Sequence, residues 1–116
     1  MDAHTLELLD FEKVRAMVAA RAACSLGKHA ASRLAPSVEM GEIHSRLALT
    51  TEMAEALSAG LHPPFGGLHD IRALARRAQI GATLEAEELA TTVETLRAIG
   101  NLDIWLQRVG DQFPRL

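Results

Sequence analysis

A chain of 116 residues, 48% of them apolar, is long enough to bury a core without metal or disulfide staples and too short for two ordinary domains. Aromatic residues make up only 3% of the chain and the formal net charge is −3, so a sheet is disfavoured and general affinity for nucleic acid is not expected. A single cysteine cannot form an internal disulfide, and no apolar run approaches the roughly 20 residues that cross a bilayer. We therefore expect an all-α protein of the cytoplasm with no membrane partner.

The first third of the chain predicts two helices, over residues 10–20 and 25–34. Asp10 is placed to cap the first, in which apolar residues recur at helical spacing. Ser25 is placed to cap the second. Pro36 ends it, because the residue before a proline is driven away from helical dihedrals.

A third helix is expected from residue 37 or 38 to about Ser58. Its apolar positions form a seam in steps of four and three residues, comprising Ile43, Leu47, Thr50, Ala54 and Leu57. Such a seam suits a near-antiparallel partner helix. Gly60 follows where a left-handed helix cap is expected.

The stretch HPPFGGLHDIRALARRAQI, residues 62–80, joins the two longest predicted helices. Its Pro-Pro and Gly-Gly pairs predict a turn, after which Asp70 caps a short helix that Gly81 stops. The outward positions of this helix are basic: Arg72, Arg76 and Arg77. These arginines are the candidate contacts for a nucleic acid or an acidic partner. The alternative is internal pairing with the acidic helices on either side.

The last helix is expected from Ala86 to Val109, with three glutamates at its positive end. We expect one apolar face, made of Leu89, Val93, Leu96, Ile99, Leu102 and Leu106, and a kink or break near Gly100. Beyond it, Phe113 and Leu116 remain apolar, as if the chain continued and packed there. The fold class is therefore all-α, with about five helices in an antiparallel bundle forming one domain over residues 1–116, and a Pro/Gly-rich connection before the short basic helix.

Signals of catalysis or cofactor binding are absent from the sequence. Gly27-Lys28 lacks the glycine and hydroxyl residues of a phosphate-binding loop, and Gly66-Gly67 lacks the preceding strand. His62 and His69 have no third or fourth ligand at a suitable interval, so a metal site is not expected. Cys24 is expected to be buried and inert, with a reactive thiol as the alternative. We assign this chain no catalytic, cofactor-binding or metal-binding residue.

Five segments, in order, carry a resemblance to a known family: LELLDFEKV, SLGKHAASRLAPS, EIHSRLALTTEMAEAL, PPFGGLHDIRALARRA and GATLEAEEL. Together they cover nearly the whole chain to about Leu106. They resemble the N-terminal segment of the bacterial MutS-type paralogue that lacks the mismatch-recognition domain, the endonuclease MutS-two group of the MutS family. The sequence departs from that pattern at Glu85-Ala86, where relatives commonly have Ser-Pro, and this weakens the expected helix cap.

The resemblance implies a helical core or lever segment at the N-terminus of a larger DNA-dependent ATPase and endonuclease that takes part in DNA repair. It implies action on branched DNA, with suppression of recombination as the cellular role, or on stalled ribosomes. The ATPase and nuclease domains, with their ATP and Mg²⁺, would lie beyond Leu116. The implied partners are the rest of the parent chain, branched DNA or a ribosome, and a second subunit in a homodimer.

Two further hypotheses come from other classes of protein. The first is a freestanding protein–protein interaction domain that uses the Ile43 to Leu57 seam to bind a partner helix. The second is an enzyme with a histidine-based metal site, which the ligand spacing disfavours.

Overall fold

The computed structural model describes residues 3–116, and over these residues the protein is all-helical, with six helices and no strand. The helices are α1 (Ala3–Leu8), α2 (Phe11–Arg21), α3 (Ser25–Ser32), α4 (Met40–Ser58), α5 (Arg72–Gln79) and α6 (Ala86–Val109). The all-α prediction is confirmed. The short helix α1 was not among the predicted elements, and α4 begins two or three residues later than predicted.

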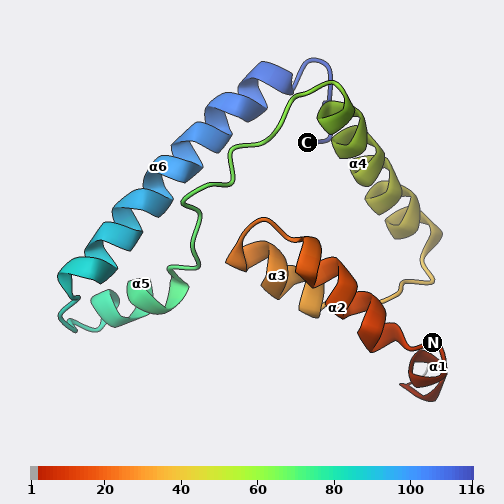
Figure 1. Cartoon of the computed structure of the whole chain (residues 1–116), viewed down its shortest axis with the longest axis horizontal. Coiled ribbons are helices and arrows are strands. Elements are labelled where there is room, and N and C mark those ends of the chain that lie inside the picture. The colour runs from red at the N-terminus through yellow and green to blue at the C-terminus, as the bar shows by residue number, and fades with distance from the viewer. Residues whose placement is uncertain (1–2) are drawn as a thin grey trace.

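The described helices do not form the predicted antiparallel bundle. Helices α4 and α6 meet at one end and diverge like the arms of a V, with the α2–α3 hairpin between them (Figure 1). The Cα radius of gyration is 17.5 Å, against about 13 Å for a compact domain of this length. The physical reason is that the predicted apolar seams of α4 and α6 do not pack against each other.

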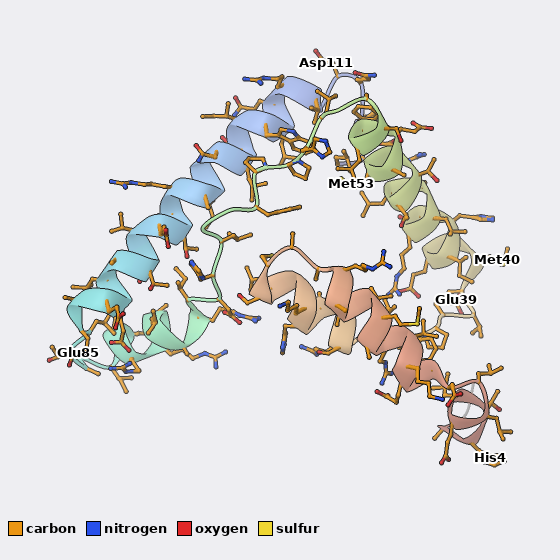
Figure 2. All side chains as sticks on the ribbon, viewed as in Figure 1. His4, Glu39, Met40, Met53, Glu85 and Asp111 are labelled. Atoms are coloured by element: carbon orange, nitrogen blue, oxygen red, sulfur yellow. The ribbon has the colours of Figure 1, made fainter. Side chains whose placement is uncertain are left out.

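The core is small and sits where α4 and α6 meet. Ala56 of α4 is buried with Trp105 and Val109 of α6, and Phe113 folds back from the C-terminal turn to complete the cluster. Met53 packs on it from the side of α4 that faces α6 (Figure 2). Phe113 and Leu116 therefore pack within this chain, which corrects the expectation that they pack against a continuation of it.

The C-terminal ends of α4 and α5 are closed in the same way, by a glycine in the left-handed region. At Gly60 (φ 78°), the N–H of Leu61 donates to the carbonyl of Ala56 across the cap (2.9 Å). At Gly81 (φ 79°), the corresponding bond runs from the N–H of Ala82 to the Arg77 carbonyl (3.0 Å). Both stops confirm the glycine signals in the sequence.

The N-terminal caps differ from the predictions. Asp10 precedes α2 in the left-handed region (φ 53°), and its carboxylate pairs with Lys13 instead of capping the helix. Ser25 is the first residue of α3 and accepts a bond from the N–H of Asp70 (3.2 Å). Glu85, by contrast, forms a capping box with Glu88, so α6 is well capped without the Ser-Pro start of relatives.

Helix α6 runs unbroken through Gly100, so the predicted break is absent, and its buried face differs from the predicted one. The buried positions are Thr95, Ala98, Trp105 and Val109, which face the connection after α4 and the core. Five of the six residues predicted to point inward are instead exposed: Leu89, Val93, Leu96, Ile99 and Leu106. Helix α6 thus carries apolar residues on two faces.

Candidate functional site

Helix α5 positions the three candidate arginines. Helix α5 begins at Arg72 with Ile71, not the predicted Asp70, at the N-cap position and without a side-chain cap. Asp70 lies one residue earlier, and its Oδ1 accepts the backbone N–H of Arg72 (3.1 Å), which satisfies one of the free donors of the first turn. The helix lies beside the start of α6, near Glu85 (Figure 2). All three arginine side chains are exposed.

Arg72 is committed to Asp70 by a two-pronged contact. Its Nε donates to Oδ1 (2.8 Å) and its Nη2 to Oδ2 (2.5 Å). These side-chain bonds, together with the backbone N–H of Arg72, hold the pKa of Asp70 well below its ordinary value. The guanidinium is therefore partly neutralised where it stands.

Arg77 is committed to the acidic first turn of α6. It pairs with Glu88 and donates to the carbonyl of Thr83 (3.2 Å). The pKa of Glu88 is lowered mainly by the hydrogen bond from the backbone N–H of Glu85, and to a smaller extent by Arg77. Internal pairing thus accounts for Arg72 and Arg77. Among the residues that the structure describes, Arg76 makes no side-chain ion pair and remains free for an outside contact.

Thr95 fixes the loop that leads into α5, and sequence reasoning did not single it out. It is only 1% exposed; its Oγ1 accepts the N–H of His69 (3.2 Å) and donates to the carbonyl of Gly67 (3.4 Å). Gly67 lies in the left-handed region (φ 76°), and a Cβ there would stand 3.4 Å from the Cγ of Glu94. Two other threonines lie within four residues of Thr95 on α6, and nothing in the sequence marks Thr95 as the one with this role.

The histidines do not gather into a metal site. His69 lies 3.2 Å from a carboxylate oxygen of Glu94 and has no third ligand beside it. Across residues 3–116, no group of three ligating side chains could hold a metal ion. Cys24 is half-buried at the start of α3, so it is less enclosed than predicted.

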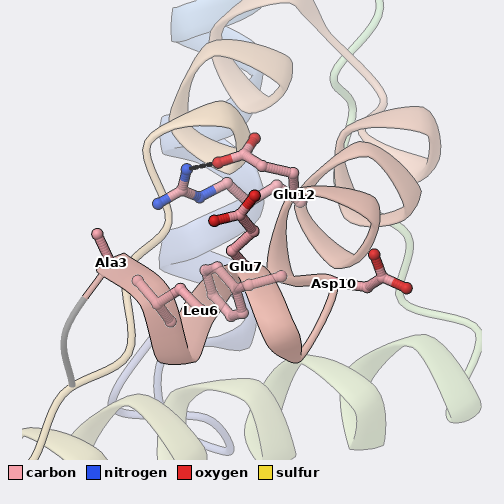
Figure 3. A pocket seen from close by; sticks show the side chains of 7 residues that line it. Ala3, Leu6, Glu7, Asp10 and Glu12 are labelled. Atoms are coloured by element: carbon pink, nitrogen blue, oxygen red, sulfur yellow. Dashed lines mark hydrogen bonds and ion pairs between the residues drawn. The ribbon is translucent and has the colours of Figure 1, made fainter.

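A hollow of about 380 Å³ lies between α1 and α2 (Figure 3). Arg15 pairs with Glu12 there, and its guanidinium carbon lies 5.1 Å from the centre of the Phe11 ring. Arg15 also donates to the carbonyl of Leu34 (2.6 Å). The guanidinium of Arg15 is therefore occupied by contacts within this chain, and it links α2 to the segment that follows α3.

Acid should weaken this chain through Asp70. Because its pKa is depressed in the folded state, its stabilisation is present above the unfolded value of about 3.9 and is lost as the pH falls further. We expect the thermal midpoint to drop below about pH 4, and to drop less in Asp70→Asn. Circular dichroism melts from neutral to strongly acidic pH check this. An equal drop in both proteins would contradict it. The control is Asp103→Asn, which removes a carboxylate that accepts a bond from Gln107 (2.9 Å).

The fold and surface together define a class: a small helical module with one modest core, no metal cluster among its described residues, and apolar faces left uncovered. None of its described helices is long and apolar enough to pass through a membrane. No family model matches the chain, and no solved structure matches it.

Curated relatives identify the family. Endonuclease MutS2 of Symbiobacterium thermophilum is 36% identical over 107 residues, which is 92% of this chain and 14% of that protein. The Acetivibrio thermocellus protein of the same name is 35% identical over 102 residues, 88% of this chain and 13% of that protein. The chain therefore spans about a seventh of the relatives it matches. It is homologous to a segment of the MutS2 family, as the resemblance predicted.

Proposed function

We propose that this chain is the non-catalytic N-terminal core or lever module of a MutS2-type ATPase and endonuclease that acts on branched DNA or on stalled ribosomes. In this proposal residues 1–116 form one domain of a longer cytoplasmic protein. Nucleotide and Mg²⁺ bind elsewhere in that protein, and the whole protein works as a homodimer. The homology to about a seventh of each MutS2 relative is the observation that carries the proposal.

The surface supports a role inside a larger assembly. The solvent-accessible surface is 8635 Å², against about 6,200 Å² for a compact monomer of this mass. The excess includes many large apolar side chains on α2, α4 and α6. Monomeric soluble proteins rarely leave broad apolar faces uncovered, so these faces fit a module that packs against more protein.

Segment replacement tests the proposal. In the Symbiobacterium thermophilum relative, the homologous segment is exchanged for this chain, and DNA-stimulated ATP hydrolysis and affinity for branched DNA are measured. We expect the exchanged protein to keep both, and a protein with the segment deleted to lose them. Loss of both activities in a folded exchanged protein would contradict the proposal.

Direct contact with nucleic acid would depend chiefly on Arg76, because Arg72 and Arg77 already have internal partners. We expect this chain to bind branched DNA weakly and only at low salt, as a few phosphate contacts allow. Arg76→Ala should remove most of that binding, and Arg72→Ala should have a smaller effect. Fluorescence anisotropy across a salt series measures it. Undiminished binding by the triple arginine-to-alanine variant would remove the arginines from the proposal.

A freestanding interaction domain remains a second candidate, supported by the seam on α4. Leu47 is 59% and Leu57 is 41% exposed, and a hollow of about 470 Å³ runs along this face past Thr50 and Ala54. Such a face could receive an amphipathic helix. Capture of a separate helical protein through this seam, lost in Leu47→Asp, would favour this candidate over a module within one longer chain.

A further inference from the structure

The outer face of α6 carries an apolar stripe on the side opposite its buried residues. The stripe consists of Leu89, Val93, Leu96 and Ile104, whose exposed fractions are 51%, 46%, 58% and 58%. Their spacing of four, three and eight residues keeps them in one row along the helix. At 1.5 Å per residue the row is about 22 Å long, the length of a helix of about 15 residues.

A glycine sits in this row without any reason inside the chain. Gly100 lies between Leu96 and Ile104, in the middle of a 24-residue helix, where glycine destabilises relative to alanine. A Cβ at this position would meet nothing within 4 Å, and the residue is not among those with positive φ. Neither close packing nor backbone conformation within this chain therefore requires glycine here.

A partner lying across the stripe would explain both observations. A missing side chain in the centre of an apolar ridge makes a notch that lets another backbone approach closely. Arg97 and Arg108, eleven residues apart, follow one edge of the stripe, and neither has an ion pair among the described residues. A straight apolar ridge with a central notch and one basic edge is complementary to an amphipathic helix that carries carboxylates along one side.

We propose that this stripe is the docking surface for an apolar-faced helix supplied by the remaining part of a MutS2 protein. The relatives provide about six times as much chain outside the matched segment, which is why we choose this occupant over a second copy. This inference rests on the proposed function, since it names the partner of the module. Leu96 and Gly100 are its centre.

Thiol labelling of a single introduced cysteine tests the surface. Leu96→Cys is made, with the other cysteines replaced, in two proteins. One is this chain alone, and the other is the Symbiobacterium thermophilum protein in which the homologous segment has been exchanged for this chain. We expect the introduced thiol to react about tenfold or more slowly in the longer protein, as a group enclosed in an interface should. Glu87→Cys, exposed near the start of the same helix on the side opposite the stripe, should react equally in both. Equal rates at Leu96→Cys, or slowing at both positions, would overturn the assignment.

Gly100 gives an independent arm. Gly100→Ala should raise the thermal midpoint of the isolated chain by a few degrees, because it favours the helix and meets no neighbour. Gly100→Leu in the longer protein should fill the notch and restore fast labelling of Leu96→Cys. Slow labelling in the presence of Gly100→Leu would contradict the notch.

Three outcomes separate this inference from its alternatives. Protection that appears in the isolated chain and grows with its concentration would identify a second copy as the occupant and overturn the proposal. If the exchanged protein keeps DNA-stimulated ATP hydrolysis but Leu96→Cys is not protected, the docking surface is wrong and the proposed function stands. If hydrolysis is lost but Leu96→Cys is still protected, the docking surface stands and the proposed function is wrong. If the exchanged protein does not fold, Leu96→Cys is labelled in this chain with the remainder of the relative added in excess. Absence of protection in that experiment counts against the docking surface.

Discussion

Phe113→Ala should lower the free energy of unfolding of this chain far more than Ile104→Ala does. Phe113 is 4% exposed and closes the cluster that joins α4 to α6 through Ala56 and Trp105. Truncating a buried phenylalanine costs about 3–5 kcal/mol, a large part of the stability of a small domain. Because Trp105 is the single tryptophan, its fluorescence reports the loss directly as a red shift at low urea and a lower unfolding midpoint.

Ile104→Ala is the matched control for this prediction. Ile104 lies next to Trp105 on α6 but is 58% exposed, so its truncation removes apolar surface without opening the core. We expect its urea midpoint to stay close to that of the parent chain. Similar midpoints for Phe113→Ala and Ile104→Ala would show that the cluster does not hold the two helices together.

Thr95→Val should release the loop from α6 while leaving its apolar contacts in place. Valine has nearly the same shape as threonine but cannot accept the N–H of His69 or donate to the carbonyl of Gly67. Leaving such buried groups unpaired costs about 1–3 kcal/mol. Hydrogen exchange at the His69 amide should speed up more than exchange elsewhere in the chain, and the unfolding midpoint should fall.

Thr95→Ser separates the hydroxyl from the packing. Serine keeps the oxygen and loses one methyl group, so we expect it to restore protection at His69. Fast exchange in both variants would mean that the loop needs the methyl group as well as the hydroxyl. Unchanged exchange in Thr95→Val would mean that Thr95 does not anchor it.

Local signals in the sequence predicted local structure well. Gly60 and Gly81 end helices because they alone accept left-handed dihedrals cheaply, and the acidic start and the end of α6 lie where the sequence places them. Asp70, predicted to cap α5, instead lies one residue before the N-cap position Ile71, and it bonds the backbone N–H of Arg72 from there. Each of these features depends on neighbours within a few residues, which a sequence displays directly.

Long-range packing could not be read in the same way. Apolar spacing on α6 identifies two candidate faces, and only the path of the connection after α4 decides that Thr95 and Ala98 are covered and Leu96 is not. The bundle prediction assumed that every apolar seam finds its partner inside the chain. That assumption fails where the partner of a seam belongs to other protein, which is what we propose for α6.

The candidate arginines show the same division. Their exposure on α5 followed from helical spacing, and the pairing of Arg77 with the acidic start of α6 was the stated alternative to an outside contact. The contact between Arg72 and Asp70 was not anticipated, although the two residues are only two positions apart. Which arginine stays free depends on how α5 turns against α6, and the sequence does not display that orientation.

Small-angle X-ray scattering of the monomeric 116-residue chain tests most directly whether it is an open framework built to be covered by other protein. An open arrangement with α4 and α6 diverging predicts a radius of gyration near 17.5 Å. A value near about 13 Å, as for a compact domain of this length, would mean that the apolar seams close on each other and would contradict both the open fold and the docking surface on α6.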